Sequence, residues 1–188
     1  FDMTQLTGKR MINFDAGGFT EGRIYVGCAG NQHGKLTQKF SFVPRRVAGN
    51  TVKITLGGLL GGHSGGDIGK GRGNSSVILG RLLSMLLAAD AVEVAHFGSG
   101  DVSQENKNGI PAECSVVVCT DTPQMLKEML GEFEAVLRDE LSDVDDGVSL
   151  TAETYSVPID KVVSRDSVAA AVRVLSLLPN GVQSMQRV

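Results

Sequence analysis

This sequence has few aromatic residues and no excess of positive charge. Aromatic side chains make up 5% of its 188 residues and tryptophan is absent, so a surface on which nucleic-acid bases stack is not expected. There are 18 Lys and Arg against 21 Asp and Glu, a formal net charge of −3. This balance gives no electrostatic attraction to nucleic acid or to acidic lipid. We therefore predict no nucleic acid and no membrane among the partners.

Long apolar runs and paired cysteines are missing as well. No apolar run is long enough to cross a bilayer, and the first residues have neither the basic start nor the apolar segment of a signal peptide. Cys28, Cys114 and Cys119 are an odd number without C-x-x-C spacing, which indicates neither a zinc knuckle nor a disulfide framework. We expect reduced, mostly buried thiols in a cytoplasmic protein or an excised piece of one.

Apolar periodicity predicts an α+β fold. Residues 10–14 and 22–28 are expected to form a short hairpin. Residues 36–43 and 51–60 alternate apolar and polar side chains, which predicts a longer antiparallel pair. The elements that follow are a helix capped by Asn74, strands 92–97 and 114–120, a helix begun by Thr122 and Pro123, a strand over 148–157 and a helix over 167–178.

The resulting β-α-β-β-α-β order is typical of a ferredoxin-like sandwich, in which helices cover one face of an antiparallel sheet. The other face is expected to be open, with Thr51, Lys53 and Thr55 exposed to solvent. An edge strand of such a sheet can extend the sheet of a neighbour. A homodimer, formed through an edge or through the helices, is therefore among the expected partners.

A glycine-rich run around His63 carries the strongest functional signal. Residues 61–67 are Gly-Gly-His-Ser-Gly-Gly-Asp, and residues 71–74 are Gly-Arg-Gly-Asn. Glycine at this density is used where the backbone needs unusual dihedral angles or close approach. The run presents one imidazole at the tip of a strand, just before a helix. It is a candidate base, metal ligand, hydrogen-bonding group or structural turn residue.

The other patterns near this run are incomplete. With only His33, His63 and His96 in the chain and no H-E-x-x-H spacing, a complete metal site is not expected within it. Ser64 lacks the G-x-S-x-G context of a catalytic nucleophile. Residues 69–73 precede a helix N-terminus that would favour an anion, but the Ser or Thr that a phosphate-binding loop needs after its lysine is missing.

Residues 57–68 and 71–74 resemble the lid-domain signature of the aminoacyl-histidine (Xaa-His) dipeptidases. These enzymes belong to the zinc metallopeptidase superfamily that includes carnosinases and acetylornithine deacetylase. Further matches occur in the same order over nearly the whole chain. They are residues 11–15, 22–30, 108–111 and 179–182.

The resemblance implies that the chain is part of a larger enzyme. In that family a catalytic domain holds two zinc ions and a glutamate base, and a lid domain closes over the dipeptide substrate. Residues 1–34 would be the edge of the catalytic domain, seen as a hairpin remnant. Residues 35–163 would be the ferredoxin-like lid and dimerisation domain, and 164–188 a trailing helix and linker toward a second lid half.

The resemblance also implies roles for three residues. Asp15 matches a metal-ligand aspartate, and Asn74 matches a substrate-binding position, although a helix cap explains it fully. His63 matches the lid histidine that polarises the scissile carbonyl and stabilises the oxyanion, either in its own chain or in a partner subunit. Because the remaining zinc ligands and the base lie outside the sequence, the chain alone is expected to be inactive and to hold no zinc tightly.

Two functions of different class are thus left open. The chain is either the lid of a zinc dipeptidase that hydrolyses Xaa-His or other dipeptides, or a non-catalytic ferredoxin-like domain that binds a protein or a small molecule. In the second case His63 is structural.

Overall fold

The structure is a computed structural model. Residues 1–38 and 39–188 are two separate compact units, and all the elements named below lie in the second. The structure describes residues 4, 7–10, 12, 22, 32, 34–89, 92–100 and 108–184. The elements are β1 (Phe42–Pro44), β2 (Asn50–Gly57), β3 (Gly62–His63), a 3₁₀ helix (Ile68–Lys70), α1 (Ser75–Ala88), β4 (Val92–Ser99), β5 (Gly109–Ile110), β6 (Cys114–Thr120), α2 (Pro123–Glu140), β7 (Ser149–Thr154), β8 (Lys161–Val163) and α3 (Arg165–Leu177).

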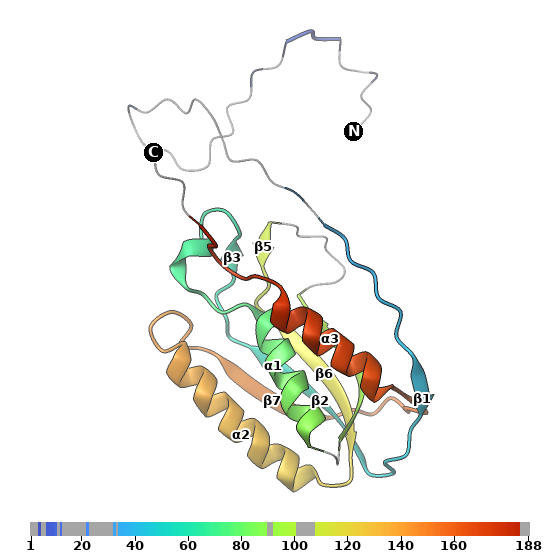
Figure 1. Cartoon of the computed structure of the whole chain (residues 1–188). Coiled ribbons are helices and arrows are strands. Elements are labelled where there is room, and N and C mark those ends of the chain that lie inside the picture. The colour runs from blue at the N-terminus through green and yellow to red at the C-terminus, as the bar shows by residue number, and fades with distance from the viewer. Residues whose placement is uncertain are drawn as a thin grey trace. The chain divides into compact units, whose positions relative to one another are not determined.

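A four-stranded antiparallel sheet with the strand order β4-β6-β2-β7 lies at the centre of the second unit (Figure 1). Ile54 of β2 faces Val116 on one side and Ala152 on the other. β2 and β6 are therefore inner strands, and β4 and β7 are edge strands. The order β2-α1-β4-β6-α2-β7 confirms the predicted ferredoxin-like sandwich, and α3 is the expected trailing helix.

Helices cover one face of this sheet, and α3 lies beside α1 (Figure 1). Close packing of α3 depends on Gly80, where a Cβ would lie 2.9 Å from Leu175 Cβ. Each large apolar side chain removed from water contributes about 1.5–3 kcal/mol, so the core between sheet and helices drives the fold. Its fully buried members include Ile54, Leu56, Val116 and Val118 of the sheet and Leu82, Leu83, Leu86 and Leu137 of the helices.

Side-chain caps fix the starts of α1 and α3 close to the predicted positions. Asn74 Oδ1 accepts the Ser76 N–H at 2.9 Å, as expected for the residue before α1. α3 begins two residues earlier than predicted because Ser164 caps it, its Oγ accepting the Ser167 N–H at 3.3 Å.

The predicted pairing of residues 36–43 with 51–60 is wrong. β1 pairs instead with β8, with Phe42 opposite Val163. Both hydrogen-bonding edges of β2 are already occupied, by β6 and β7. No edge of β2 is left for the segment that precedes it in the chain.

The second face of the sheet is only partly open. Lys53 is exposed as predicted, but Ala95, Val117 and Cys119 are buried together with Val162 of β8. The expectation of a wholly open face is therefore wrong for the part that β8 and its flanking residues cover.

Cys114 and Cys119 are free and buried, as expected. Burial raises the pKa of the Cys114 thiol to about 12, so this group is unreactive at neutral pH. Cys28 and nearly all of the predicted hairpin lie outside the described residues, and the proposed boundaries at 34 and 163 stay predictions. No helix in the described part of the chain is long and apolar enough to cross a membrane.

Candidate functional site

His63 lies on a two-stranded ribbon that is separate from the main sheet. It belongs to β3, which pairs with β5 so that His63 is opposite Gly109. The Ser64 N–H extends this pairing by donating to Asn108 O at 2.7 Å. We call residues 58–73, which connect β2 to α1, the histidine loop. In Figure 1 the ribbon lies near the first turn of α1, and His63 is exposed there.

The loop backbone determines which nitrogen of the imidazole carries the proton. The N–H groups of Gly65 and Gly66 donate to His63 Nδ1 at 3.0 and 3.2 Å. A ring nitrogen that accepts hydrogen bonds has no proton of its own, so the neutral ring is protonated at Nε2. Within the described residues Nε2 has no hydrogen-bond partner. The Nε2–H is thus available to an acceptor outside the described residues.

Asp67 holds the backbone of His63 in place. Asp67 Oδ2 accepts the His63 N–H at 2.7 Å, and the Asp67 N–H donates to His63 O at 2.8 Å. Lys70 Nζ donates to Asp67 Oδ1 at 2.6 Å, and Arg72 Nη1 lies 3.6 Å from Oδ2. The hydrogen bond from Lys70, followed by that from the His63 amide, lowers the pKa of Asp67 to about 2.

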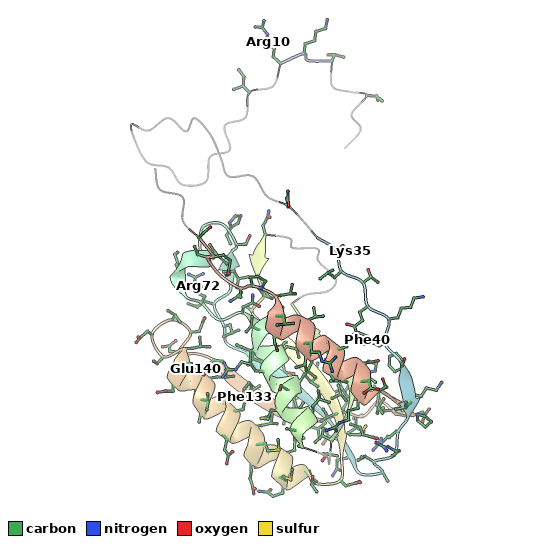
Figure 2. The ribbon with its side chains drawn as sticks, in the orientation of Figure 1. Arg10, Lys35, Phe40, Arg72, Phe133 and Glu140 are labelled. Carbon is green, nitrogen blue, oxygen red and sulfur yellow. The ribbon has the colours of Figure 1, made fainter. Side chains whose placement is uncertain are left out.

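Arg72, labelled in Figure 2, connects the end of the histidine loop to a residue near the start of the same loop. Its Nη1 donates to Gly61 O at 2.6 Å. The next residue, Gly62, has φ +139°, and a Cβ there would lie 2.5 Å from Arg72 Nη1. Glycine is therefore needed at position 62 for both its conformation and its space.

The hydrogen bonds of Asp67 predict a change in the loop at low pH. Because the pKa of Asp67 is lowered in the folded chain, ionised Asp67 stabilises the loop above the ordinary pKa, and this contribution is lost as the pH falls from about 4 to about 2. The His63 amide resonance of the 188-residue chain should report a midpoint near 2. Asp67→Asn should abolish the transition. A midpoint at the ordinary value of 3.8 would contradict the hydrogen-bond assignment.

A buried carboxylate from another part of the chain joins the two ends of the histidine loop. Asp145, which is 1% exposed, accepts the Leu60 N–H with Oδ1 and the Gly73 N–H with Oδ2, both at 2.6 Å. Sequence reasoning did not find this residue. Asp143 and Asp146 in the same acidic run are exposed, and nothing in the sequence distinguishes Asp145 from them.

The other predicted site residues are not brought to His63 by the described structure. Asn74 follows the loop directly, but Oδ1 caps α1 and Nδ2 donates to Asn180 Oδ1 at 2.8 Å. Its substrate-binding role stays a prediction. Asp15 lies outside the described residues. In the part of the chain that the structure describes, no three His, Cys, Asp or Glu side chains are grouped so that they could hold a metal ion.

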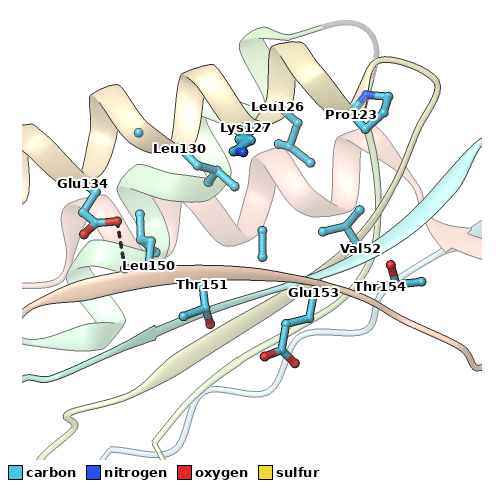
Figure 3. A pocket seen from close by; sticks show the side chains of 12 residues that line it. Val52, Pro123, Leu126, Lys127, Leu130, Glu134, Leu150, Thr151, Glu153 and Thr154 are labelled. Carbon is cyan, nitrogen blue, oxygen red and sulfur yellow. Dashed lines mark hydrogen bonds between the residues drawn. The ribbon is translucent and has the colours of Figure 1, made fainter.

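A groove of about 440 Å³ lies between α2 and the edge strand β7 (Figure 3). Leu126, Leu130 and Leu150 contribute to its apolar lining. Glu134 Oε2 accepts the Leu150 N–H at 3.3 Å, so a helix side chain satisfies one outward-facing donor of this edge.

Comparison with known proteins shows what this part of the chain is similar to. The peptidase dimerisation domain matches residues 54–145. The chain is 32% identical over 178 residues to the cytosol non-specific dipeptidase of Escherichia coli (strain K12), covering 92% of this chain and 34% of that protein. Aminoacylhistidine dipeptidase from Vibrio alginolyticus, a crystal structure, matches with a TM-score of 0.69 and 28% identity, covering 78% of this chain and 30% of that one.

The chain thus spans about a third of the length of these two relatives. The matched residues include the second half of β2 and all of α1, β4, β6 and α2, as well as the whole histidine loop. The predicted resemblance is confirmed at the level of the domain. Residues 54–145 thus carry the dimerisation domain of the M20 peptidases, and the chain is a homologue of the cytosol non-specific dipeptidase.

Proposed function

We propose that the chain is the lid of a zinc-dependent dipeptidase, in which His63 donates a hydrogen bond from Nε2 to the carbonyl oxygen of the scissile peptide bond. One observation carries this proposal: Nδ1 accepts two backbone N–H groups, which leaves the proton on Nε2. The names of the two relatives, both dipeptidases, support the reaction class.

The chemical value of such a donor lies in its preorganisation. When water attacks a peptide carbonyl, negative charge develops on the oxygen, and a donor that is already oriented stabilises it without reorganising. The loop backbone orients the imidazole before substrate arrives, and the exposed position of His63 gives access to a substrate bound elsewhere in the enzyme. In this proposal His63 neither moves a proton nor binds metal.

Zinc enters the proposal only through the family resemblance. The described residues offer no ligand set for it, so the proposal assigns zinc, the catalytic base and most of the dipeptide contacts to the rest of the enzyme. A cytoplasmic location is likewise proposed, supported by the name of the Escherichia coli relative.

The proposed activity is tested with the complete protein that contains this chain. We expect it to hydrolyse Xaa-His dipeptides, to lose activity on dialysis against a chelator and to regain it with zinc. Released histidine, quantified by chromatography, is the readout. An inactive zinc-loaded protein, tested on Xaa-His and other dipeptides, would overturn the proposed reaction.

We also propose a second copy of this chain as the partner at the β7 edge. The Tyr155 N–H donates to Thr51 O of β2 at 2.9 Å. Backbone N–H groups of an antiparallel strand alternate in direction, so the N–H groups of Thr151 and Glu153 also face β2. The N–H groups of Ala152 and Thr154 therefore face away from it. In the described part of the chain no strand pairs with the outer edge of β7, and an edge with an apolar groove beside it suits addition of another strand.

Ala152→Pro should prevent this pairing without breaking the sheet. Proline removes an N–H that β2 does not use, which is the arrangement tolerated at an edge strand. We expect dimeric wild type and monomeric Ala152→Pro by light scattering of the 188-residue chain, with Ala152→Val, which keeps the N–H, remaining dimeric. A Pro variant that stays folded and dimeric would exclude this edge as the interface.

A further inference from the structure

We infer that Asp145 is a positioning residue for His63: its carboxylate fixes both ends of the histidine loop and so fixes where the imidazole is presented. The catalytic part of this inference rests on the proposed role of His63. The structural part is independent of it, because it concerns the loop alone.

Beyond Leu59, which is buried in the core, the histidine loop is not held by burial of apolar side chains. From Leu60 to Arg72 no residue larger than glycine is buried, and Leu60 itself is 66% exposed. The hydrophobic effect therefore contributes little to the position of this segment. Its position depends on hydrogen bonds, and those from outside the loop come from Asp145 and from the pairing of β3 with β5.

The two hydrogen bonds of Asp145 close the loop at its base. One carboxylate receives the N–H of Leu60, three residues before His63, and the N–H of Gly73, just before the cap of α1. Joining the ends of a loop removes most of the conformations available to the residues between them. Hydrogen bonds to a charged acceptor are roughly twice as strong as neutral ones, and the bond from Gly73 is also buried from competing water.

Asp145 can act as a fixed point because its own backbone is held. Its N–H donates to Leu141 O at 2.8 Å, and its carbonyl accepts the Val148 N–H at 3.0 Å. These bonds tie it to the end of α2 and the start of β7. Gly73 fits closely against this group, since a Cβ there would lie 2.8 Å from Leu59 Cδ2 and 3.3 Å from Asp145 Oδ2.

Asp67 and Asp145 therefore have different tasks. Asp67 is half-buried within the loop and orders the turn that follows His63. Asp145 is buried and connects that ordered turn to the sheet and helices. A loop without Asp145 would keep the turn ordered by Asp67 and its pairing with β5, but would lose its connection to the end of α2 and the start of β7.

The structural part is tested by Asp145→Asn, with Asp146→Asn as the matched control. Asparagine keeps the size and one acceptor oxygen, but its NH₂ group faces a backbone N–H and one hydrogen bond is lost. In the 188-residue chain, hydrogen exchange at the Leu60, Gly65, Gly66 and Gly73 amides should become roughly ten- to hundredfold faster. In the same variant the core amides of β6 should exchange at wild-type rates. In Asp146→Asn all of these amides should exchange at wild-type rates.

The catalytic part is tested in the complete enzyme. We expect Asp145→Asn to lower kcat roughly ten- to hundredfold with KM changed much less, and to cause no further loss in a His63→Ala background, since a residue that acts through His63 has nothing left to position. Unchanged loop exchange would overturn the structural inference. An equal kcat loss with and without His63 would overturn the catalytic one. Wild-type turnover of His63→Ala would instead refute the proposed function and leave the structural result intact.

Discussion

Replacing His63 with alanine is expected to lower kcat of the complete protein, in the proposed dipeptidase reaction, by about 10²- to 10³-fold, the loss seen when one oxyanion donor is removed. KM should change much less, because the hydrogen bond strengthens only as charge develops on the carbonyl oxygen. Zinc content should stay at the wild-type value, since His63 is a donor in this proposal and not a ligand. Steady-state kinetics and metal analysis of the same preparation measure both quantities.

Ser64→Ala is the matched control for that experiment. Ser64 is the exposed neighbour of His63, and its contact with the ribbon is made by its backbone N–H, which alanine keeps. The control should retain wild-type kcat. A His63→Ala enzyme with normal kcat would remove the oxyanion role, and one that has lost zinc would point to metal binding instead.

The second large effect is expected at the start of the histidine loop, where Gly58→Ala should strongly destabilise the fold. Gly58 has φ +80°, and a Cβ there would overlap the carbonyl oxygen of Gly147 and lie 2.6 Å from its carbonyl carbon. Both obstacles are backbone, so neither side-chain rotation nor a small shift removes them. We expect a loss of about 3 kcal/mol in the free energy of unfolding, or a melting temperature lower by about 6–12 °C.

The adjacent glycine provides the control. A Cβ at Gly57 would meet nothing within 4 Å, and its φ lies outside the left-handed region. Gly57→Ala should therefore melt within about 2 °C of wild type. Circular dichroism measures the melting of both variants. Equal melting temperatures would show that the contact between Gly58 and Gly147 does not constrain the loop.

The parts of the fold that the sequence predicted are those governed by local chemistry. Asn74 before an apolar helical pattern gave the start of α1, and Pro123 gave the start of α2. The alternation of helix and strand patterns then limited the topology to one common arrangement. Strand pairing was harder to predict from the sequence. β1 and β8 are more than a hundred residues apart in the chain, and their pairing depends on which edges the other strands occupy.

The sequence was sufficient to predict the imidazole of the candidate site, but not the carboxylate of Asp145 that holds the loop carrying it. The density of glycine around His63 indicated an exposed imidazole. Asp145 could not be found in the same way, because a buried carboxylate and its solvated neighbours have the same sequence signature. Its importance comes only from the two backbone N–H groups that the fold brings to it.

The scarcity of buried side chains between Leu60 and Arg72 also bears on how this part of the molecule responds to heat. A segment held mainly by hydrogen bonds can open and reclose while the sheet beneath it stays intact, because its opening exposes little apolar surface. Such an event has a small heat capacity change and a shallow dependence on denaturant. We therefore expect the histidine loop to open locally, as a unit distinct from the core formed by β2, β6 and α1.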